Sequence, residues 1–391
     1  MANILIWMSP EPGHILPTIK PARDLSNAGH TVVYQVPESI RKELEDLRFP
    51  TIGFFNEVTR PYESSLHQPS RSANWHYWAI SRKYPGTEYP KAFRRELVRA
   101  VSAVNAHLMI VDGVFDELLN LHMHEALPPS CNVARLYIHL PYREISATDC
   151  SPEKGPVVFL SPKEFEIPEF LNPNAFYTES GHFEEGRCPE FSWPSLDQEL
   201  PLVYCSFGSQ LERYPDVEAD MRTVIAAAQR GEFQLILNAG IFAPKLQPSA
   251  GPNVCIYHRV PQLDVLQKAS AMLLHGGFGS LKDCIYHQVP MLILPQKWDQ
   301  PSNGMRVCHH GLGLTLSREQ ISEQSIVDSI CTLVHDPNFK TNLATMRDIF
   351  IDRDKQEPTR VLVESILNGE CVKAADHTDK WPEQPVALGR W

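Results

Sequence analysis

Two kinds of segment alternate along this chain. Short runs of consecutive apolar residues, typical of parallel strands buried on both faces, are separated by longer stretches with helical periodicity. The first such unit is the apolar run NILIWMS (3–9), a helical stretch over 18–29, and a second apolar run, TVVYQV (31–36). Strand, turn, helix and strand in this order predict a doubly wound α/β domain.

The pattern continues through the first half of the chain. Residues 107–113 and 134–140 are predicted as later strands of the same sheet, with one helix over 115–127 between them. Residues 56–92 follow neither period and are rich in Trp, Tyr, His and Pro, which indicates loops and short helices at a site.

A second α/β pattern begins after the proline-marked stretch 188–201, which we interpret as a linker. Strands are predicted over 202–209, 233–240, 253–260, 271–277 and 291–296. The 391 residues suit two domains. We assign the first to residues 1–190, the second to 191–370, and expect the tail 371–391 to pack back on the first. A cleft facing the carboxyl ends of both sheets is the expected binding site.

Composition limits the partners that this chain can have. Its net charge of −11 disfavours non-specific attraction to nucleic acid or anionic lipid. Nine cysteines, an odd number without a CxxC pair, argue against a disulfide framework. The sequence shows no apolar stretch of the ~18–20 residues that a membrane span requires. We expect a cytoplasmic monomer or homodimer, with no nucleic-acid partner and no membrane insertion.

The clearest chemical signal is the glycine-rich segment AMLLHGGFGSLKD (271–283). It predicts a strand, a turn, and a helix that begins near Gly279 or Ser280. Backbone N–H groups and the helix dipole favour an anion there, and glycines allow a phosphate to come close. The segment is neither GxGxxG nor a Walker loop. Ser206, Gly208 and Ser209 form a second polar turn at the same edge, although both turns could also be simple strand–helix connections.

Residues 260–303 resemble the nucleotide-sugar signature of the UDP-glycosyltransferase family, which includes bacterial natural-product and macrolide glycosyltransferases. The segments 202–209 and PGHILP (12–17) resemble two further family motifs in the right order. The resemblance implies the GT-B fold, an α/β architecture of two facing Rossmann-like domains with an interdomain cleft. It also implies inverting sugar transfer from a nucleotide donor, without a metal or a bound cofactor.

The resemblance assigns donor-binding roles to particular residues. His275 matches a contact to the diphosphate, Gly279 and Ser280 match the helix start that holds the distal phosphate, and Asp299 with Gln300 match a pair that binds sugar hydroxyls. The complete implied donor set is Ser209, Arg259, Val260, Gln262, His275, Gly277, Gly279, Ser280, Asp283, Asp299 and Gln300.

Two positions in this set depart from the family pattern. Arg259 stands where the family usually has a Trp that stacks on uracil. A guanidinium can also stack on a base, so the choice between UDP and dTDP stays open. Asp283 replaces a glutamate that binds the ribose, and its side chain is one methylene shorter.

Sugar transfer to a hydroxyl or an amine also requires a base that removes the acceptor proton, and a histidine near neutral pKa suits this role. His14 follows the first predicted strand and matches the family's catalytic histidine. Asp112, at the end of a strand, matches the aspartate that supports it, and Asp116 is the nearby alternative. A carboxylate partner would hold the imidazole tautomer and stabilise its charged form.

Other chemical signals favour structural explanations. The acidic pair Asp352 and Asp354 lies in a charged stretch that predicts a solvated helix. The histidines at 122, 124, 309 and 310 lack further metal ligands at suitable spacing, so no metal site is predicted. Trp75, Tyr77 and Trp78 either pack in the core or line an acceptor pocket.

The sequence therefore suggests a metal-independent inverting glycosyltransferase with His14 as base. It would move a sugar from a UDP-hexose or dTDP-deoxysugar to a small hydrophobic natural product. A UDP-GlcNAc 2-epimerase-like enzyme and a non-catalytic partner of another glycosyltransferase are the alternatives.

Overall fold

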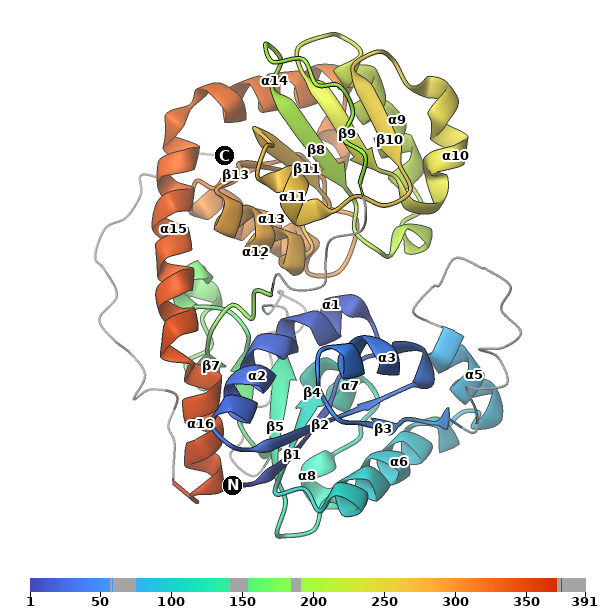
Figure 1. The fold of residues 1–391 in the computed structure, drawn as a ribbon, viewed down its shortest axis with the longest axis vertical. Coiled ribbons are helices and arrows are strands. Elements are labelled where there is room, and N and C mark those ends of the chain that lie inside the picture. The colour runs from blue at the N-terminus through green and yellow to red at the C-terminus, as the bar shows by residue number, and fades with distance from the viewer. Residues whose placement is uncertain are drawn as a thin grey trace.

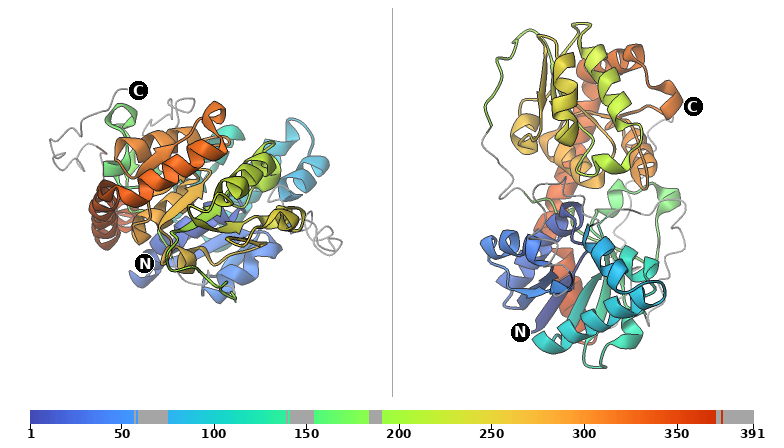
Figure 2. Two further views of the ribbon diagram at one scale, coloured as in Figure 1. Left: turned by 90° about the horizontal axis from the view of Figure 1, so that it is seen from above. Right: turned by 90° about the vertical axis from the view of Figure 1, so that its right-hand side faces the viewer.

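The protein contains two α/β domains, one above the other in the view of Figure 1. This computed structural model describes residues 1–56, 58, 75–138, 140, 154–183, 191–370 and 374. Each domain has one parallel sheet between helices, as the two views of Figure 2 also show. The predicted α/β architecture of two Rossmann-like domains is confirmed.

The first sheet has seven parallel strands in the order β3-β2-β1-β4-β5-β6-β7. Its strands are β1 (Asn3–Trp7), β2 (Thr31–Val36), β3 (Thr51–Gly53), β4 (Leu108–Asp112), β5 (Asn132–Tyr137), β6 (Val157–Phe159) and β7 (Phe176–Tyr177). The helices of this half are α1 (Pro12–Ile15), α2 (Ile19–Asn27), α3 (Glu38–Asp46), α5 (Trp75–Lys83), α6 (Glu88–Val104), α7 (Gly113–Leu118) and α8 (Met123–Ala126).

The second sheet has six parallel strands in the order β10-β9-β8-β11-β12-β13. They are β8 (Leu202–Ser206), β9 (Gln234–Asn238), β10 (Val254–Tyr257), β11 (Ala271–Leu274), β12 (Met291–Ile293) and β13 (Gly313–Thr315). The helices are α9 (Val217–Ala228), α10 (Ala243–Leu246), α11 (Gln262–Leu266), α12 (Phe278–His287), α13 (Gln300–His309), α14 (Glu323–His335), α15 (Pro337–Gln356) and α16 (Pro358–Leu367).

Burial on both faces explains why the strands are continuous apolar runs. Along β1, Ile4 and Ile6 belong to one core cluster of buried side chains. Leu5 and Trp7 belong to another cluster. Successive side chains of a strand point to opposite faces, so residues 4–7 of this central strand are covered by protein on both faces.

The last helices run along one side of both domains (Figure 1). Helix α15 packs against α12 of the second domain, whereas α16 packs against α2 of the first. Leu362 and Val363 of α16 are part of the same core cluster as Ile4. The range 191–370 assigned from the sequence to the second domain thus includes one helix that lies on the first.

Buried contacts join the domains on this same side. Arg306 of α13 donates two hydrogen bonds to the carboxylate of Glu166, at 2.7 and 2.9 Å. Neither side chain of this pair is exposed. The ammonium group of Lys282, on α12, donates to the carbonyl oxygens of Leu160 and Ser180. Segment 160–180 therefore anchors the second domain to the first.

The prediction of one helix over 115–127 is wrong. Helix α7 ends at Leu118 and α8 begins only at Met123. Asn120 and His122 both have left-handed backbone conformations, with φ of 48° and 47°, which a continuous right-handed helix excludes. The side chain of Asp116 accepts a hydrogen bond from the Met123 backbone N–H at 3.3 Å.

Several sequence predictions concern residues outside the described ranges. The tail over 371–391 is among them except for Ala374, which contacts the core cluster of the first domain. Most of 56–74 is also outside, although α5 and α6 follow as helices. In the described part of the chain, every helix is too short or too polar to span a bilayer.

Candidate active site

His14 and Asp112 lie together at the carboxyl edge of the first sheet. His14 is on α1, directly after β1, and Asp112 is the last residue of the neighbouring strand β4. The imidazole Nδ1 is 2.6 Å from Asp112 Oδ2, which also accepts a hydrogen bond from the Ser9 backbone N–H. Adjacent parallel strands end at one edge, so the fold brings together two side chains that are distant in sequence.

The environment of His14 favours the charged imidazole. Burial alone lowers the pKa of His14, but the charge of Asp112 and its hydrogen bond, with the charges of Glu11 and Asp299, raise the pKa above its ordinary value. Asp116 does not serve as the partner, because its carboxylate caps the backbone at Met123 instead. Of the two candidate carboxylates, Asp112 therefore orients the histidine.

The glycine-rich turn 275–279 lies at the corresponding edge of the second sheet, where it follows β11 and includes the first two residues of α12. The backbone at Gly276 is left-handed, with φ of 91°, and a Cβ there would lie 3.1 Å from the carbonyl oxygen of Gln300. In the facing turn after β8, a Cβ on Gly208 would lie 2.7 Å from the His275 ring. At Gly279, by contrast, a Cβ would meet nothing within 4 Å. The space beside Gly279 is therefore open.

His275 is buried at the centre of these two turns, with 8% of its surface exposed. Burial lowers its pKa to about 4, although the charge of Asp299 opposes this effect. The imidazole is therefore neutral near pH 7. It can donate one N–H to a phosphate oxygen, which is compatible with the diphosphate contact that the resemblance assigns to it.

Asp283 lies on α12 beside Gln262 of α11. The Gln262 amide donates to Asp283 Oδ2 at 2.6 Å and lies 3.4 Å from Ser280 Oγ. The structure thus joins three residues of the expected donor set. His182 of the first domain was missed, yet its Nδ1 is 3.2 Å from Asp283 Oδ1 and its ring stacks on Tyr286 at 3.9 Å. No local pattern marks residue 182, because its contact is purely tertiary.

Asp299 and Gln300 differ in their surroundings. The side chain of Gln300 is 2% exposed. Its Oε1 accepts from the backbone N–H groups of Gln296 and Lys297, and its Nε2 donates to Tyr214 Oη at 3.0 Å. This residue shapes the loop before α13. Asp299 is partly exposed and receives a hydrogen bond from Asn303 at 2.8 Å, so it is the member of the pair that a ligand can reach.

The remaining predicted residues lie at different depths. Ser209 and Arg259 are exposed at the ends of β8 and β10, Gly277 is the N-cap of α12, and Val260 is 5% exposed. The side chains of Trp75, Tyr77 and Trp78, at the start of α5, lie outside the described part of the structure.

A polar bridge across the two domains was also missed. Glu11, three residues before His14, accepts from the Gln210 amide at 2.6 Å and from the Arg213 guanidinium at 3.2 Å. Glu11 belongs to the first domain, whereas Gln210 and Arg213 belong to the second domain, directly after the turn at Ser209. The sequence does show a carboxylate, Glu11, close to the candidate base. It does not show that Gln210 and Arg213 would be the partners of this carboxylate.

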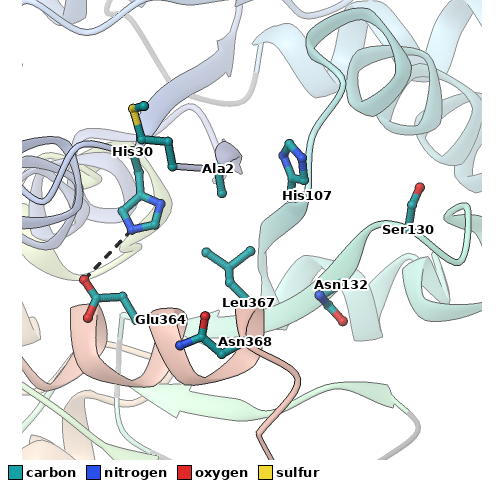
Figure 3. A pocket seen from close by; sticks show the side chains of 9 residues that line it. Ala2, His30, His107, Ser130, Asn132, Glu364, Leu367 and Asn368 are labelled. Atoms are coloured by element: carbon teal, nitrogen blue, oxygen red, sulfur yellow. Dashed lines mark ion pairs between the residues drawn. The ribbon is translucent and has the colours of Figure 1, made fainter.

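Two other features lie away from this edge. His122, His124 and Glu125 have ligand atoms within 4.8 Å of one another and could hold a metal ion, but they precede β5 at the opposite edge of the sheet. A cavity of about 430 Å³, drawn in Figure 3, is lined by Ala2, His107, Asn132 and residues of α16. Ala2 and His107 precede β1 and β4, and Asn132 is the first residue of β5, so this cavity also lies at the amino edge.

The two acidic residues of α15 have different surroundings. Asp352 is 69% exposed and pairs with Lys355. Asp354 instead accepts from the Ser180 backbone N–H at 2.9 Å and from the hydroxyl of Tyr286. The expectation of a solvated helix is therefore wrong at Asp354, which joins the two domains.

Comparisons with known proteins agree with this geometry. Residues 228–365 match the family model described as erythromycin biosynthesis protein CIII-like, C-terminal domain. NDP-glycosyltransferase YjiC of Bacillus subtilis (strain 168) is 25% identical over 237 residues, which are 56% of this chain. The match spans 59% of that relative's own length.

Solved structures show the same fold. The glycotransferase of kitacinnamycin superposes with a TM-score of 0.70 at 18% identity, covering 94% of this chain and 99% of that one. Spinosyn rhamnosyltransferase SpnG, complexed with thymidine diphosphate, superposes with a TM-score of 0.63 at 17% identity, covering 94% and 100%. Together with the motifs and the two parallel sheets, these matches show that the chain has the GT-B fold and that it is similar to natural-product enzymes of the UDP-glycosyltransferase family.

Proposed function

We propose that this protein is an inverting glycosyltransferase that uses His14 as general base. It would move a sugar from a nucleoside diphosphate donor, either a UDP-hexose or a dTDP-deoxysugar, to a small hydrophobic natural product. The observation that carries the proposal is the 2.6 Å contact between His14 and Asp112 at the edge facing the glycine-rich turns.

The base acts through the nitrogen opposite Asp112. With Nδ1 held by the carboxylate, Nε2 takes the proton of the acceptor hydroxyl as its oxygen bonds to the sugar C1. The bond from C1 to the diphosphate breaks on the opposite side, which inverts the anomeric carbon. Asp112 stabilises the imidazolium that results. The raised pKa of His14 supports this role, because a stronger base accepts the proton more readily.

The second domain holds the donor in this proposal. The N-terminal end of α12 and the backbone of the turn 275–279 would receive the diphosphate, and Ser209 with neutral His275 would donate to it. Gln262 and Asp283 would contact the ribose, and Arg259 and Val260 would contact the nucleobase. Asp299 would bind the hydroxyls of the transferred sugar. No metal or bound cofactor is required, since helix dipole and N–H donors would stabilise the leaving diphosphate.

The acceptor side is apolar beside the base. The Phe115 ring lies edge-on to His14, with 5.8 Å between ring centroids, and also contacts Trp7. Trp7 is buried in the core, whereas Phe115 is partly exposed, so the Phe115 ring supports a hydrophobic acceptor. Trp75, Tyr77 and Trp78 stay candidates for its outer wall. We further propose a cytoplasmic protein that works as a monomer or homodimer without nucleic-acid partners.

Thermal unfolding with UDP, dTDP and their sugars tests the donor half of the proposal. A ligand that binds the folded state raises its stability by mass action, about 2.7 kcal/mol at one hundred times Kd. The thymidine diphosphate bound to SpnG makes dTDP the first compound to try. Transfer to a panel of hydrophobic aglycones, with the anomeric configuration read by NMR, tests the reaction. No stabilisation by any nucleotide, or a retained configuration, would refute the proposal.

A further inference from the structure

Trp298 has an unusual place in the loop between β12 and α13. Its side chain is 46% exposed, although it is large and apolar. Its backbone is left-handed, with φ of 57°. Bulky residues rarely adopt this conformation, and strain of this kind persists where the surroundings impose it, often at functional sites.

Neighbouring side chains hold the indole in position. The Tyr214 ring meets it edge-on, with 5.6 Å between centroids, and the Arg213 guanidinium lies 5.6 Å from its centroid. Arg213 is itself bound to Glu11 of the first domain. Tyr214 is tied to Gln300, whose amide oxygen binds the backbone of the same loop. The ring is thus pre-positioned by both domains and still exposes almost half of its surface.

The loop of Trp298 is adjacent to the glycine-rich turn. The amide of Asn303 donates to the carbonyl of Gly276 at 2.9 Å, and the carbonyl of Gln300 is close to the same glycine. The next residue, Asp299, is close enough for its charge to act on both His14 and His275. Trp298 therefore lies close to the glycine-rich turn, where the diphosphate is proposed to bind, and close to the candidate base His14.

We propose that Trp298 is a specificity-determining residue that stacks on the C–H-lined face of the sugar carried by the donor. This inference rests on the proposed function. Trp298 belongs to the same domain as the diphosphate turn, which assigns it to the donor sugar rather than to the acceptor. Asp299 would bind hydroxyls at the sugar's edge while the indole covers its apolar face. A ring of this kind excludes water from one side of the sugar and favours donors with a large C–H surface.

The variant Trp298→Asn removes the ring and keeps a residue that tolerates a left-handed backbone. Trp298→Phe is the matched control, because it keeps an aromatic face. Each protein is titrated with dTDP and UDP alone, and kcat/KM is measured for the corresponding nucleotide sugars. For Trp298→Asn we expect nucleotide Kd to stay within about twofold of the wild type and donor kcat/KM to fall at least tenfold, equivalent to about 1.4 kcal/mol. Trp298→Phe should keep most of the activity.

The outcomes separate the two proposals. Wild-type protein that binds no nucleotide refutes the proposed function. If nucleotides bind but Trp298→Asn keeps wild-type kcat/KM, only the inference fails. It also fails if the variant weakens nucleotide binding to the same degree, or if the loss appears only in the acceptor KM. Thermal unfolding confirms folding, and we expect the Asn variant to melt no lower than the wild type because the strained position is relieved.

Discussion

His14 and Asp112 are 98 residues apart in sequence, yet their side chains lie 2.6 Å apart at the end of two adjacent strands. If His14 is the base, His14→Ala should lower turnover by about 10²–10⁴-fold, because general base catalysis is lost. Donor affinity should change little, since the donor is expected to bind the other domain. Single-turnover transfer and nucleotide titration measure the two effects separately. Near wild-type turnover in His14→Ala would show that another group is the base.

The pH dependence of kcat/KM should also reflect the contact between His14 and Asp112. Only the neutral imidazole accepts a proton, so kcat/KM should rise with pH through the raised pKa of His14, which lies above 6.5. In Asp112→Asn the burial of the ring remains but the charge is gone, so the rising limb should move to lower pH. The stability linked to His14 has the opposite sign, because it is fully present below pH 6.5 and is lost as pH rises through the raised pKa. An unmoved limb in Asp112→Asn would contradict the assignment.

The two glycines of the turn should respond differently to alanine. Gly276→Ala adds a Cβ at a left-handed position against the Ile293 side chain and the Gln300 carbonyl. It should therefore destabilise the fold. Gly279→Ala enters open space in the first turn of α12 and should leave stability equal or higher by about 0.5–1 kcal/mol. If phosphate approaches there, Gly279→Ala should still weaken nucleotide binding. Chemical unfolding and nucleotide titration of both variants test this contrast.

The strands and the edge that carries the site could be predicted from the sequence, whereas contacts between distant segments could not. Continuous apolar runs such as Leu108–Asp112 identified buried strands, because parallel strands are covered on both faces. The polar residues that follow those strands indicated the site edge. The break at Asn120 could not be read, since helical periodicity does not report a left-handed residue. The burial of Gln300 and the approach of His182 to Asp283 depend on contacts between distant segments, which no local pattern encodes.

Breaking the buried interdomain ion pair should be costly. Glu166→Gln leaves the Arg306 guanidinium uncompensated in a fully buried position, and we expect a loss of about 3–5 kcal/mol in the free energy of unfolding. The double change Glu166→Leu with Arg306→Met removes both charges and should restore most of that loss. Glu88→Gln, at an exposed pair, is the surface control. Urea unfolding distinguishes them, and equal effects at 166 and 88 would contradict the expectation.

The bridge from Glu11 should favour the closed arrangement of the domains. Glu11→Ala removes acceptors for Gln210 and Arg213, and hydrogen bonds to charged groups contribute about 1.5–3 kcal/mol. We expect kcat/KM to fall about tenfold or more while nucleotide binding to the second domain stays unchanged. Glu43→Ala, on the exposed face of α3, is the control. Small-angle scattering of the nucleotide complex should show a more open particle, and identical scattering would argue against the bridge.

The return of α16 to the first domain has a consequence for protein engineering. A chimaera that exchanges the C-terminal half up to the end of the chain would replace Leu362 and Val363, which complete the core of the N-terminal half. The transplantable unit ends instead at the junction of α15 and α16, where Glu357 has a left-handed backbone. A chimaera joined at this position keeps Leu362 and Val363 with the N-terminal half, whose core they complete.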